Sequence, residues 1–503
     1  MKNIYITNVG CEYYLDIARK LLGFDFKVKI IGFGENKIYQ PKSLNNFIKE
    51  VKPKVVIFED INLIERFDKI FDPDYSAFSK EFYSEISYFE KLFIMSIDRN
   101  SFEPISQLER LRLFHKYFAH AYKLLNNEKI DGILMFGTPH GPWEITLFAV
   151  AKILKIDIRY TDFGLCPELS TIESDIYIRK SYDKNERNLG ILANSNESVE
   201  IKEILEKRIN SHFVWDFTPI NIFKKRLRVI KRIFGLILLR PFSKYNSAEF
   251  FFLRSSRRGV FLVLKYIKYL KELTQSLNFY KNESTNDLPN RNSIVVFLHH
   301  QPEASTMPMG YIFADQLLML EIILNAAPKD LNIYIKEHPH MYEYPAQDRH
   351  ERSKYFYKQL LRDKRVKFLD QNMNTNTIIK NVKYICSICG SVSWETLKLG
   401  KPCIIFGWAW FSDCKSCYSV DSPKSFLSAL EKINKKTKSN VSNDLKAFIE
   451  RLKKRLIYGA ALRNAFDYLG ESYRYQDGLI NISEAIKLSF MSKKKSINKN
   501  FNS

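Results

Sequence analysis

Two series of short β-rich runs, each alternating with helical stretches, constrain the possible folds of this chain most strongly. Runs dominated by Val, Ile, Tyr and Phe are typical of strands, and apolar side chains at a spacing of 3.6 residues are typical of helices. Strands are expected at 2–9, 26–33, 53–60, 130–137 and 156–164, and again at 293–300, 331–338, 366–370, 383–388 and 401–407. Such alternation builds a parallel sheet covered by helices. We therefore predict an α/β fold with two Rossmann-like domains.

The chain is long enough for several cores, because domains of about 150 residues are the norm. Its 503 residues include a stretch from about 196 to 288 that is helical in pattern, basic and poor in Gly, and that leads into the polar run KNESTNDLPNRN. Polar runs of this kind are typical of linkers. The predicted units are an N-terminal Rossmann-like domain at 1–195, a helical basic insertion and linker at 196–290, a C-terminal Rossmann-like domain at 291–490 and a disordered basic tail at 491–503.

The charge balance favours anionic partners. Lys and Arg outnumber Asp and Glu by 78 to 56, which gives a formal charge of +22. The segment FKKRLRVIKRIFGLILLRPF at 223–242 has the pattern of a basic amphipathic helix, which either lies on an anionic membrane surface or packs on a neighbour by its Ile and Leu side chains. Because no export signal and no membrane-spanning apolar run is present, we expect a cytoplasmic protein. It would be peripheral on the inner face of the membrane if the 223–242 helix lies on lipid.

The cysteines leave two interpretations open. Two CxxC pairs, Cys386 with Cys389 and Cys414 with Cys417, have a spacing close to that of a zinc ribbon. The first pair, however, falls in a predicted buried strand, where a zinc knuckle would leave no room for a sheet. Buried thiols are therefore the favoured interpretation, with structural zinc as the alternative.

Polar clusters follow three strands of the second series. In an open α/β sheet, ligands bind beyond the carboxyl ends of the strands, where helix N-termini present N–H groups. Gly390 permits a tight turn, the hydroxyl groups of Ser391 and Ser393 suit phosphate oxygens, and Glu395 can reach a sugar diol; the alternative is an ordinary helix cap. The candidate substrate-binding residues are Gln301, Glu303, Ser305, Thr306, Glu337, Pro339, Gly390, Ser391, Ser393 and Glu395.

His338 is the first candidate for a catalytic residue. Pro339 biases it toward an extended backbone, which holds its imidazole at the end of the strand. An imidazole there can donate a hydrogen bond to a leaving phosphate or protonate it. For the loop at 298–306, the alternative is a structural role, in which Ser305 and Thr306 cap a helix and His299 is a buried strand residue.

The strand ends of the first series carry three further candidates, His140, Glu144 and Asp162. A carboxylate or imidazole at this position could accept the proton of an acceptor hydroxyl group. Asp162 is the first choice because it lies at a strand end just before a Gly. A turn residue is the alternative role for Asp162.

Several other functional classes lack support in the sequence. The chain has no RRM, KH, helix-turn-helix or zinc-finger signature, so a nucleic-acid partner is not expected. Neither GxxxxGK[ST] nor GxGxxG occurs, which argues against a P-loop NTPase and a dinucleotide-binding domain.

Three motifs together resemble a known family. LHHQPEAST at 298–306, YIKEHP at 334–339 and CGSVSWETLKLGKPCIIFG at 389–407 resemble the C-terminal half of bacterial capsule and surface-polysaccharide glycosyltransferases, which include capsule-type Kdo transferases. The similarity is clear from 294 to 410. A looser match covers 139–158.

This resemblance implies a GT-B fold, in which two Rossmann-like domains face each other across a cleft. It implies a nucleotide-sugar donor, by preference a CMP-linked Kdo or sialic-acid-like sugar, a glycan or glycolipid acceptor, and no metal cofactor. His338 would contact the donor phosphate, and Ser391 and Ser393 would bind it. Gln301 and Ser305 match the first loop of the nucleotide-sugar-binding domain.

The acceptor-side motif departs from the family pattern, because Phe163 separates Asp162 from Gly164. The identity of the general base is therefore left open. The predicted function is an inverting glycosyltransferase of surface-glycan synthesis. The alternatives are a CDP-polyol glycerophosphotransferase of the teichoic-acid type and a non-catalytic glycan-binding or assembly protein on the same scaffold.

Overall fold

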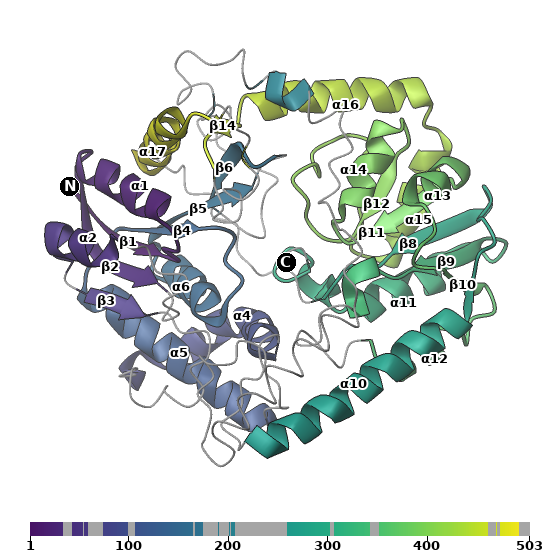
Figure 1. Ribbon diagram of the computed structural model, residues 1–503, viewed down its shortest axis with the longest axis horizontal. Helices are drawn as coiled ribbons and strands as arrows, with labels where there is room; N and C mark the ends of the chain where they lie inside the picture. Colours follow the sequence, from purple (N-terminus) through teal and green to yellow (C-terminus); the bar gives the residue numbers. More distant parts are fainter. Residues whose placement is uncertain are drawn as a thin grey trace.

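Two parallel-rich sheets, each with helices on both faces, form the two halves of the molecule (Figure 1). This computed structural model describes residues 1–33, 43–53, 55–58, 74–98, 106–163, 166–174, 190, 201, 203–206, 259–301, 306–342, 352–460, 469 and 473–491. The basic segment at 223–242 and the tail at 492–503 lie outside the described residues. Among the described helices, none is both long and apolar enough to cross a membrane.

The first sheet has the strand order β14-β6-β5-β4-β1-β2-β3 in the described part of the chain. Its parallel strands are β1 (Lys2–Thr7), β2 (Phe26–Phe33), β3 (Val55–Phe58), β4 (Gly132–Phe136) and β5 (Asp157–Phe163). Two antiparallel strands extend it, β6 (Leu169–Glu173) and β14 (Ile457–Tyr458). The helices of this half are α1 (Glu12–Leu22), α2 (Leu44–Val51), α4 (Lys80–Asp98), α5 (Gln107–Asn127) and α6 (Pro142–Ile153), with a short 3₁₀ turn η2 (Tyr75–Ala77).

The second sheet has the order β13-β12-β11-β8-β9-β10-β7, and every described pair in it is parallel. Its strands are β7 (Ser284–Thr285), β8 (Ser293–Phe297), β9 (Asn332–Lys336), β10 (Val366–Leu369), β11 (Tyr384–Ser387), β12 (Cys403–Ile405) and β13 (Cys417–Ser419). Its helices are α10 (Gly259–Asn282), α11 (Gln316–Ala326), α12 (Lys354–Leu360), α13 (Thr375–Asn381), α14 (Ser391–Lys398) and α15 (Pro423–Asn434), with 3₁₀ turns η5 (Tyr311–Ala314) and η6 (Pro339–Tyr342).

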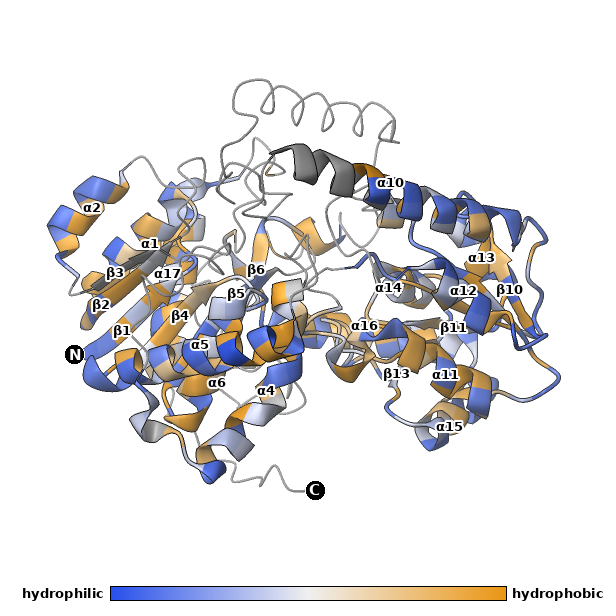
Figure 2. Cartoon of the chain, turned by 90° about the horizontal axis from the view of Figure 1, so that it is seen from below, coloured by the Kyte–Doolittle hydropathy of each residue, from blue (hydrophilic) through white to orange (hydrophobic). Residues whose placement is uncertain are grey.

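The predicted α/β architecture with two Rossmann-like halves is confirmed. Apolar runs such as β8 are buried along their whole length because helices cover both faces of the sheet. Figure 2 shows the corresponding pattern, with hydrophobic strands inside and hydrophilic outer helix faces. In both sheets the strand order reverses beside a central strand, between β1 and β4 and between β8 and β11. Ligands of doubly wound sheets bind at such switch points.

The two halves share apolar contacts. Met307 and Ala314, which follow β8, pack in the core between α4, α5 and α6 of the first half. A second shared cluster joins Leu169 to Trp394 and Phe448. A cavity of about 320 Å³ also lies between the halves, lined by α4 on one side and by the starts of α11 and α12 on the other.

The chain returns to the first half at its end. Helix α16 (Lys438–Lys453) leads to β14, which pairs with β6, and α17 (Tyr475–Met491) then packs against α1 (Figure 1). The predicted domain boundaries remain a prediction, and the structure adds that β14 and α17 lie with the first sheet.

Arg159 of β5 holds the end of α17. Its fully buried guanidinium group donates to the Ser489 carbonyl oxygen from Nε at 3.1 Å and from Nη2 at 2.6 Å. Lys2 donates to the neighbouring Phe490 carbonyl oxygen at 2.6 Å. Because the last carbonyl groups of a helix have no partners within it, two cations satisfy this end and complement the helix dipole.

We expect Arg159→Ala to destabilise the protein by about 2–4 kcal/mol, because it leaves a buried carbonyl oxygen without its donor and opens a cavity. Thermal unfolding monitored by circular dichroism measures the effect. Arg362→Ala, at an exposed arginine, is the matched control and is expected to change little. Equal midpoints for the two variants would contradict the role given to Arg159.

Candidate functional site

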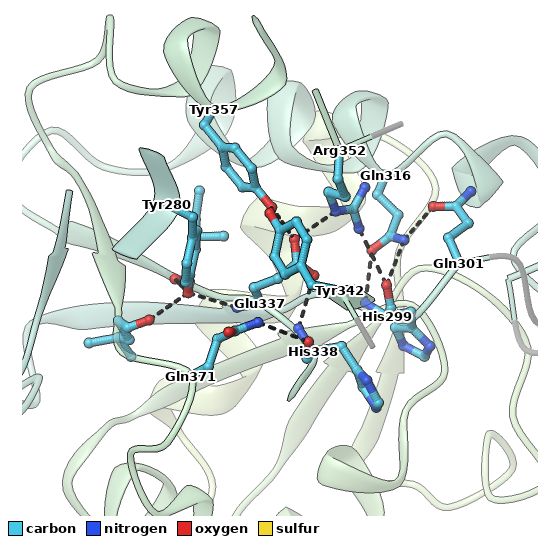
Figure 3. A network of polar contacts seen from close by, with 12 residues as sticks. Tyr280, His299, Gln301, Gln316, Glu337, His338, Tyr342, Arg352, Tyr357 and Gln371 are labelled. Atoms are coloured by element: carbon cyan, nitrogen blue, oxygen red, sulfur yellow. Dashed lines mark hydrogen bonds and ion pairs between the residues drawn. The ribbon is translucent and has the colours of Figure 1, made fainter. Parts of the chain in front are cut away.

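A buried polar network lies beneath the carboxyl ends of β8 and β9 (Figure 3). Its centre is the ion pair between Glu337 and Arg352, in which Arg352 Nε lies 2.7 Å from Glu337 Oε2. The two side chains are 0% and 2% exposed. Tyr357 donates its hydroxyl to the same carboxylate oxygen at 2.7 Å. Burial raises the pKa of Tyr357, so this hydroxyl remains a donor.

The network holds the backbone of His338 on both sides. Its N–H group donates to Glu337 Oε1 at 2.9 Å, and its carbonyl oxygen accepts from Gln371 Nε2 at 3.2 Å. The imidazole is half-buried, and the ring of the buried His300 lies 5.9 Å from it, centroid to centroid. The predicted placement of His338 at the end of a strand agrees with the position of β9. Pro339 is exposed and begins η6.

Glu337 therefore lies below the site and not at its surface. Tyr280, which projects from α10, accepts the Glu337 N–H group at 3.0 Å. The carboxylate accepts from Arg352, Tyr357 and the His338 N–H group, so its role in this structure is to orient the adjacent His338.

His299 continues β8 and connects this network to the loop before α14. Its Nε2 accepts the Cys389 N–H group at 3.2 Å. Its backbone N–H donates to Gln316 Oε1 at 2.9 Å, and its carbonyl oxygen accepts from Arg352 Nη2 at 3.3 Å. The buried position of His299 agrees with the structural alternative for this residue, but the sequence offered no sign of these partners.

The loop before α14 has one exposed hydroxyl group and one buried one. Ser391 is exposed at the first residue of α14, and Gly390 in front of it provides no side-chain cap. Ser393 is fully buried, and its hydroxyl lies 2.8 Å from that of Ser387. Glu395 forms an ion pair with Lys398 at 3.1 Å.

Amide side chains connect Gln301 to the start of α11. Gln301 is buried, its Nε2 donates to the Ala314 carbonyl oxygen at 2.6 Å, and its Oε1 accepts from Gln316 at the same distance. Thr306 is also buried. Glu303 and Ser305 lie outside the described residues.

The three candidates of the first half gather around Thr138, after β4. The Thr138 hydroxyl donates to Asp162 Oδ1 at 3.0 Å, and the Thr138 carbonyl oxygen lies 2.6 Å from His140 Nδ1. A carbonyl oxygen only accepts, so Nδ1 of His140 carries a proton and Nε2 is left as the basic nitrogen of the neutral ring. Glu144 accepts the N–H groups of His140 and Gly141 at 2.9 and 3.0 Å and so caps α6.

The cysteines of the two CxxC pairs are thiols packed among apolar side chains. Cys386, Cys414 and Cys417 are buried and Cys389 is half-buried. Burial raises the pKa of Cys414 to about 11. Within the described residues, no group of three or more His, Cys, Asp or Glu side chains could hold a metal ion.

Comparison with known proteins bears on this arrangement. Residues 177–414 match the family model of capsule polysaccharide biosynthesis proteins. The family resemblance of this chain is confirmed. The match spans β8 to β12 and includes His299, His338 and Ser391, so the strand-end loops lie within the capsule family region. A search of curated proteins finds no match.

Solved structures resemble this chain only distantly. The KpsC β-Kdo 2,7 transferase of Thermosulfurimonas dismutans is 12% identical, covering 81% of this chain and 97% of that one, with a TM-score of 0.30. The β-Kdo 2,4 transferase of the same KpsC has 13% identity, coverages of 66% and 82% and a TM-score of 0.29. UDP-GlcNAc 2-epimerase of Methanocaldococcus jannaschii has 16% identity, coverages of 90% and 99% and a TM-score of 0.24. Likenesses at these scores carry no information on activity.

Lys336, the last residue of β9, supports a pH-dependent prediction. It is 4% exposed, its Nζ donates to the Gln371 carbonyl oxygen at 2.7 Å, and burial lowers its pKa to about 8. An unfolded lysine titrates near 10.4, so between about pH 8 and pH 10 the unfolded chain binds more protons and the contribution of Lys336 to stability rises with pH.

We expect Lys336→Met to raise the free energy of unfolding at pH 7 by about 2 kcal/mol, since the gain from removing a buried charge exceeds the lost hydrogen bond. This gain should shrink as the pH rises from 8 to 10. Urea unfolding across that range measures it, with Lys380→Met at an exposed lysine as the control. A gain in stability that does not vary with pH would contradict a lowered pKa for Lys336.

Proposed function

We propose that this capsule family protein is an inverting glycosyltransferase that transfers an acidic sugar, Kdo or a sialic-acid-like sugar, from a CMP-linked donor to a glycan or glycolipid acceptor. The family places the chain in capsule polysaccharide biosynthesis. The observation that carries the proposal is the arrangement at the switch point of the second sheet. There, the loops after β9 and β11 flank the central strand β8.

The donor phosphate is proposed to lie between His338 and the start of α14. The half-buried imidazole of His338 lies on one side of β8, and exposed Ser391 lies on the other. Strands in a sheet are about 4.8 Å apart, so these two groups are separated by roughly 10 Å across β8, a span suited to a bound phosphate and its neighbouring groups. The N–H groups at the start of α14, which no side chain of Gly390 caps, favour an anion.

In the proposed reaction, the second half stabilises the leaving phosphate and the first half accepts the proton of the acceptor. An acceptor oxygen attacks the anomeric carbon while the bond from that carbon to the phosphate oxygen breaks, and the nucleotide leaves with the bonding electrons. His338 stabilises the negative charge that grows on the phosphate, which lowers the barrier because this charge is largest in the transition state. The acceptor proton passes to Nε2 of His140, with Asp162 as the alternative base.

Glu337, Ser393 and Gln301 take supporting roles in this proposal, because their side chains are buried and bound to other protein groups. Pro339 begins η6 next to His338. The Asp162 carboxylate accepts a hydrogen bond from the Thr138 hydroxyl group.

A nucleotide panel tests the donor class. We expect CMP to raise the melting temperature more than CDP, UDP or GDP at equal concentration, because ligand binding to the folded state alone is stabilising. A larger shift with CDP-glycerol would favour the glycerophosphotransferase. No shift with any compound would favour the non-catalytic binding protein and refute the transferase.

Two histidine variants separate the tasks of the two halves. We expect His338→Ala and His140→Ala each to lower transfer at least about 100-fold without changing the melting temperature of the free protein. Only His338→Ala should also lose the stabilisation by CMP, since His140 serves the acceptor. Asp162→Asn is the comparison. If it abolishes transfer while His140→Ala does not, Asp162 is the base.

A further inference from the structure

We propose that His299 is a positioning residue that holds the start of α14 in register with His338. This inference deepens the proposed function, because it names the residue that sets the spacing between the two sides of the phosphate site.

His299 lies between the two sides of the proposed phosphate site. Phe297, the last residue of β8, pairs with Ser387 of β11 and with Lys336 of β9. Two residues further on, His299 therefore lies between the loop that starts α14 and the segment that carries His338. This is the switch point itself, and the side chain is buried there.

The ring of His299 packs directly on the α14 loop. Its Nε2 accepts the Cys389 N–H group at 3.2 Å, so the neutral ring carries its proton on Nδ1. A Cβ atom on Gly390 would lie 3.1 Å from Nε2 and 3.3 Å from Cε1. Glycine at this position thus permits a close approach that a larger residue would obstruct.

The backbone of His299 is held equally firmly. Gln316 binds both its N–H group, at 2.9 Å, and its carbonyl oxygen, at 3.2 Å. Arg352 donates to the same carbonyl oxygen at 3.3 Å. The imidazole therefore projects from a fixed backbone and cannot follow the loop if the loop moves.

A continuous path of contacts joins the two sides of the site. His338 N–H donates to Glu337, Glu337 pairs with Arg352, and Arg352 binds the backbone of His299. The ring of His299 then binds Cys389, two residues before Ser391. Removing the Nε2 acceptor breaks the last step of this path while His338 stays in place. The loop then keeps the hydrogen bond from the Gly390 N–H group to Ser387 Oγ, at 3.1 Å, but loses its link to β8 through Cys389.

Hydrogen–deuterium exchange tests the contact without any ligand. In His299→Leu, which has similar bulk but no acceptor, we expect the peptide that contains Cys389 and Gly390 to exchange at least about 10-fold faster than in wild type. His299→Gln keeps an acceptor oxygen and should restore slow exchange. Unchanged exchange in His299→Leu would overturn the inference, whatever the protein binds.

CMP affinity measured by calorimetry is the second readout. We expect His299→Leu to weaken CMP binding about 10-fold and His299→Gln to stay within about 3-fold of wild type. Faster exchange with unchanged CMP affinity would also overturn the positioning role. If wild type binds no nucleotide, the proposed function fails, and the exchange experiment still decides whether His299 holds the loop.

A second variant covers the case in which His299→Leu does not fold. Gly390→Ala keeps His299 but places a methyl group against its ring. We expect the same faster exchange at Cys389 and the same loss of CMP affinity. Wild-type behaviour of Gly390→Ala in both measurements would contradict the close packing on which the inference depends.

Discussion

The buried ion pair between Glu337 and Arg352 is the interaction on which the geometry of the candidate site depends. Both charged groups are removed from water, which costs free energy that the mutual attraction offsets only when the remaining lone pairs and protons are satisfied. Tyr357 and the His338 N–H group complete the shell of the carboxylate. Breaking such a pair typically costs about 3–5 kcal/mol, so the backbone that presents His338 has little freedom to move.

Packed apolar side chains join the two halves of the molecule next to the strand-end loops. Met307 and Ala314, just beyond β8, pack in the core of the first half. The return of α17 to the first sheet, where Arg159 secures its end, closes the chain across both halves. A movement between the halves would therefore reach the strand-end loops through packed side chains.

The strand and helix pattern predicted most of the fold because burial on both faces produces apolar runs that are recognisable locally. The helices α4 and α5 lie between β3 and β4 in the chain. The strand-end motifs were recognisable for a similar reason, since polar clusters interrupt those runs. The pattern could not indicate which polar side chains face a ligand. Ser391 and Ser393 look alike in the sequence, yet one is exposed and the other is bonded to Ser387.

The sequence by itself determined the two parallel sheets and the positions where polar loops leave them, because both follow from the spacing of apolar residues along a few turns of chain. Only the tertiary structure decided the direction of each polar side chain. Arg352 binds Glu337, and Gln316 and Cys389 bind His299, although these partners are distant from them in the chain. Contacts of this kind depend on how whole strands and helices pack, and no local pattern of residues encodes them.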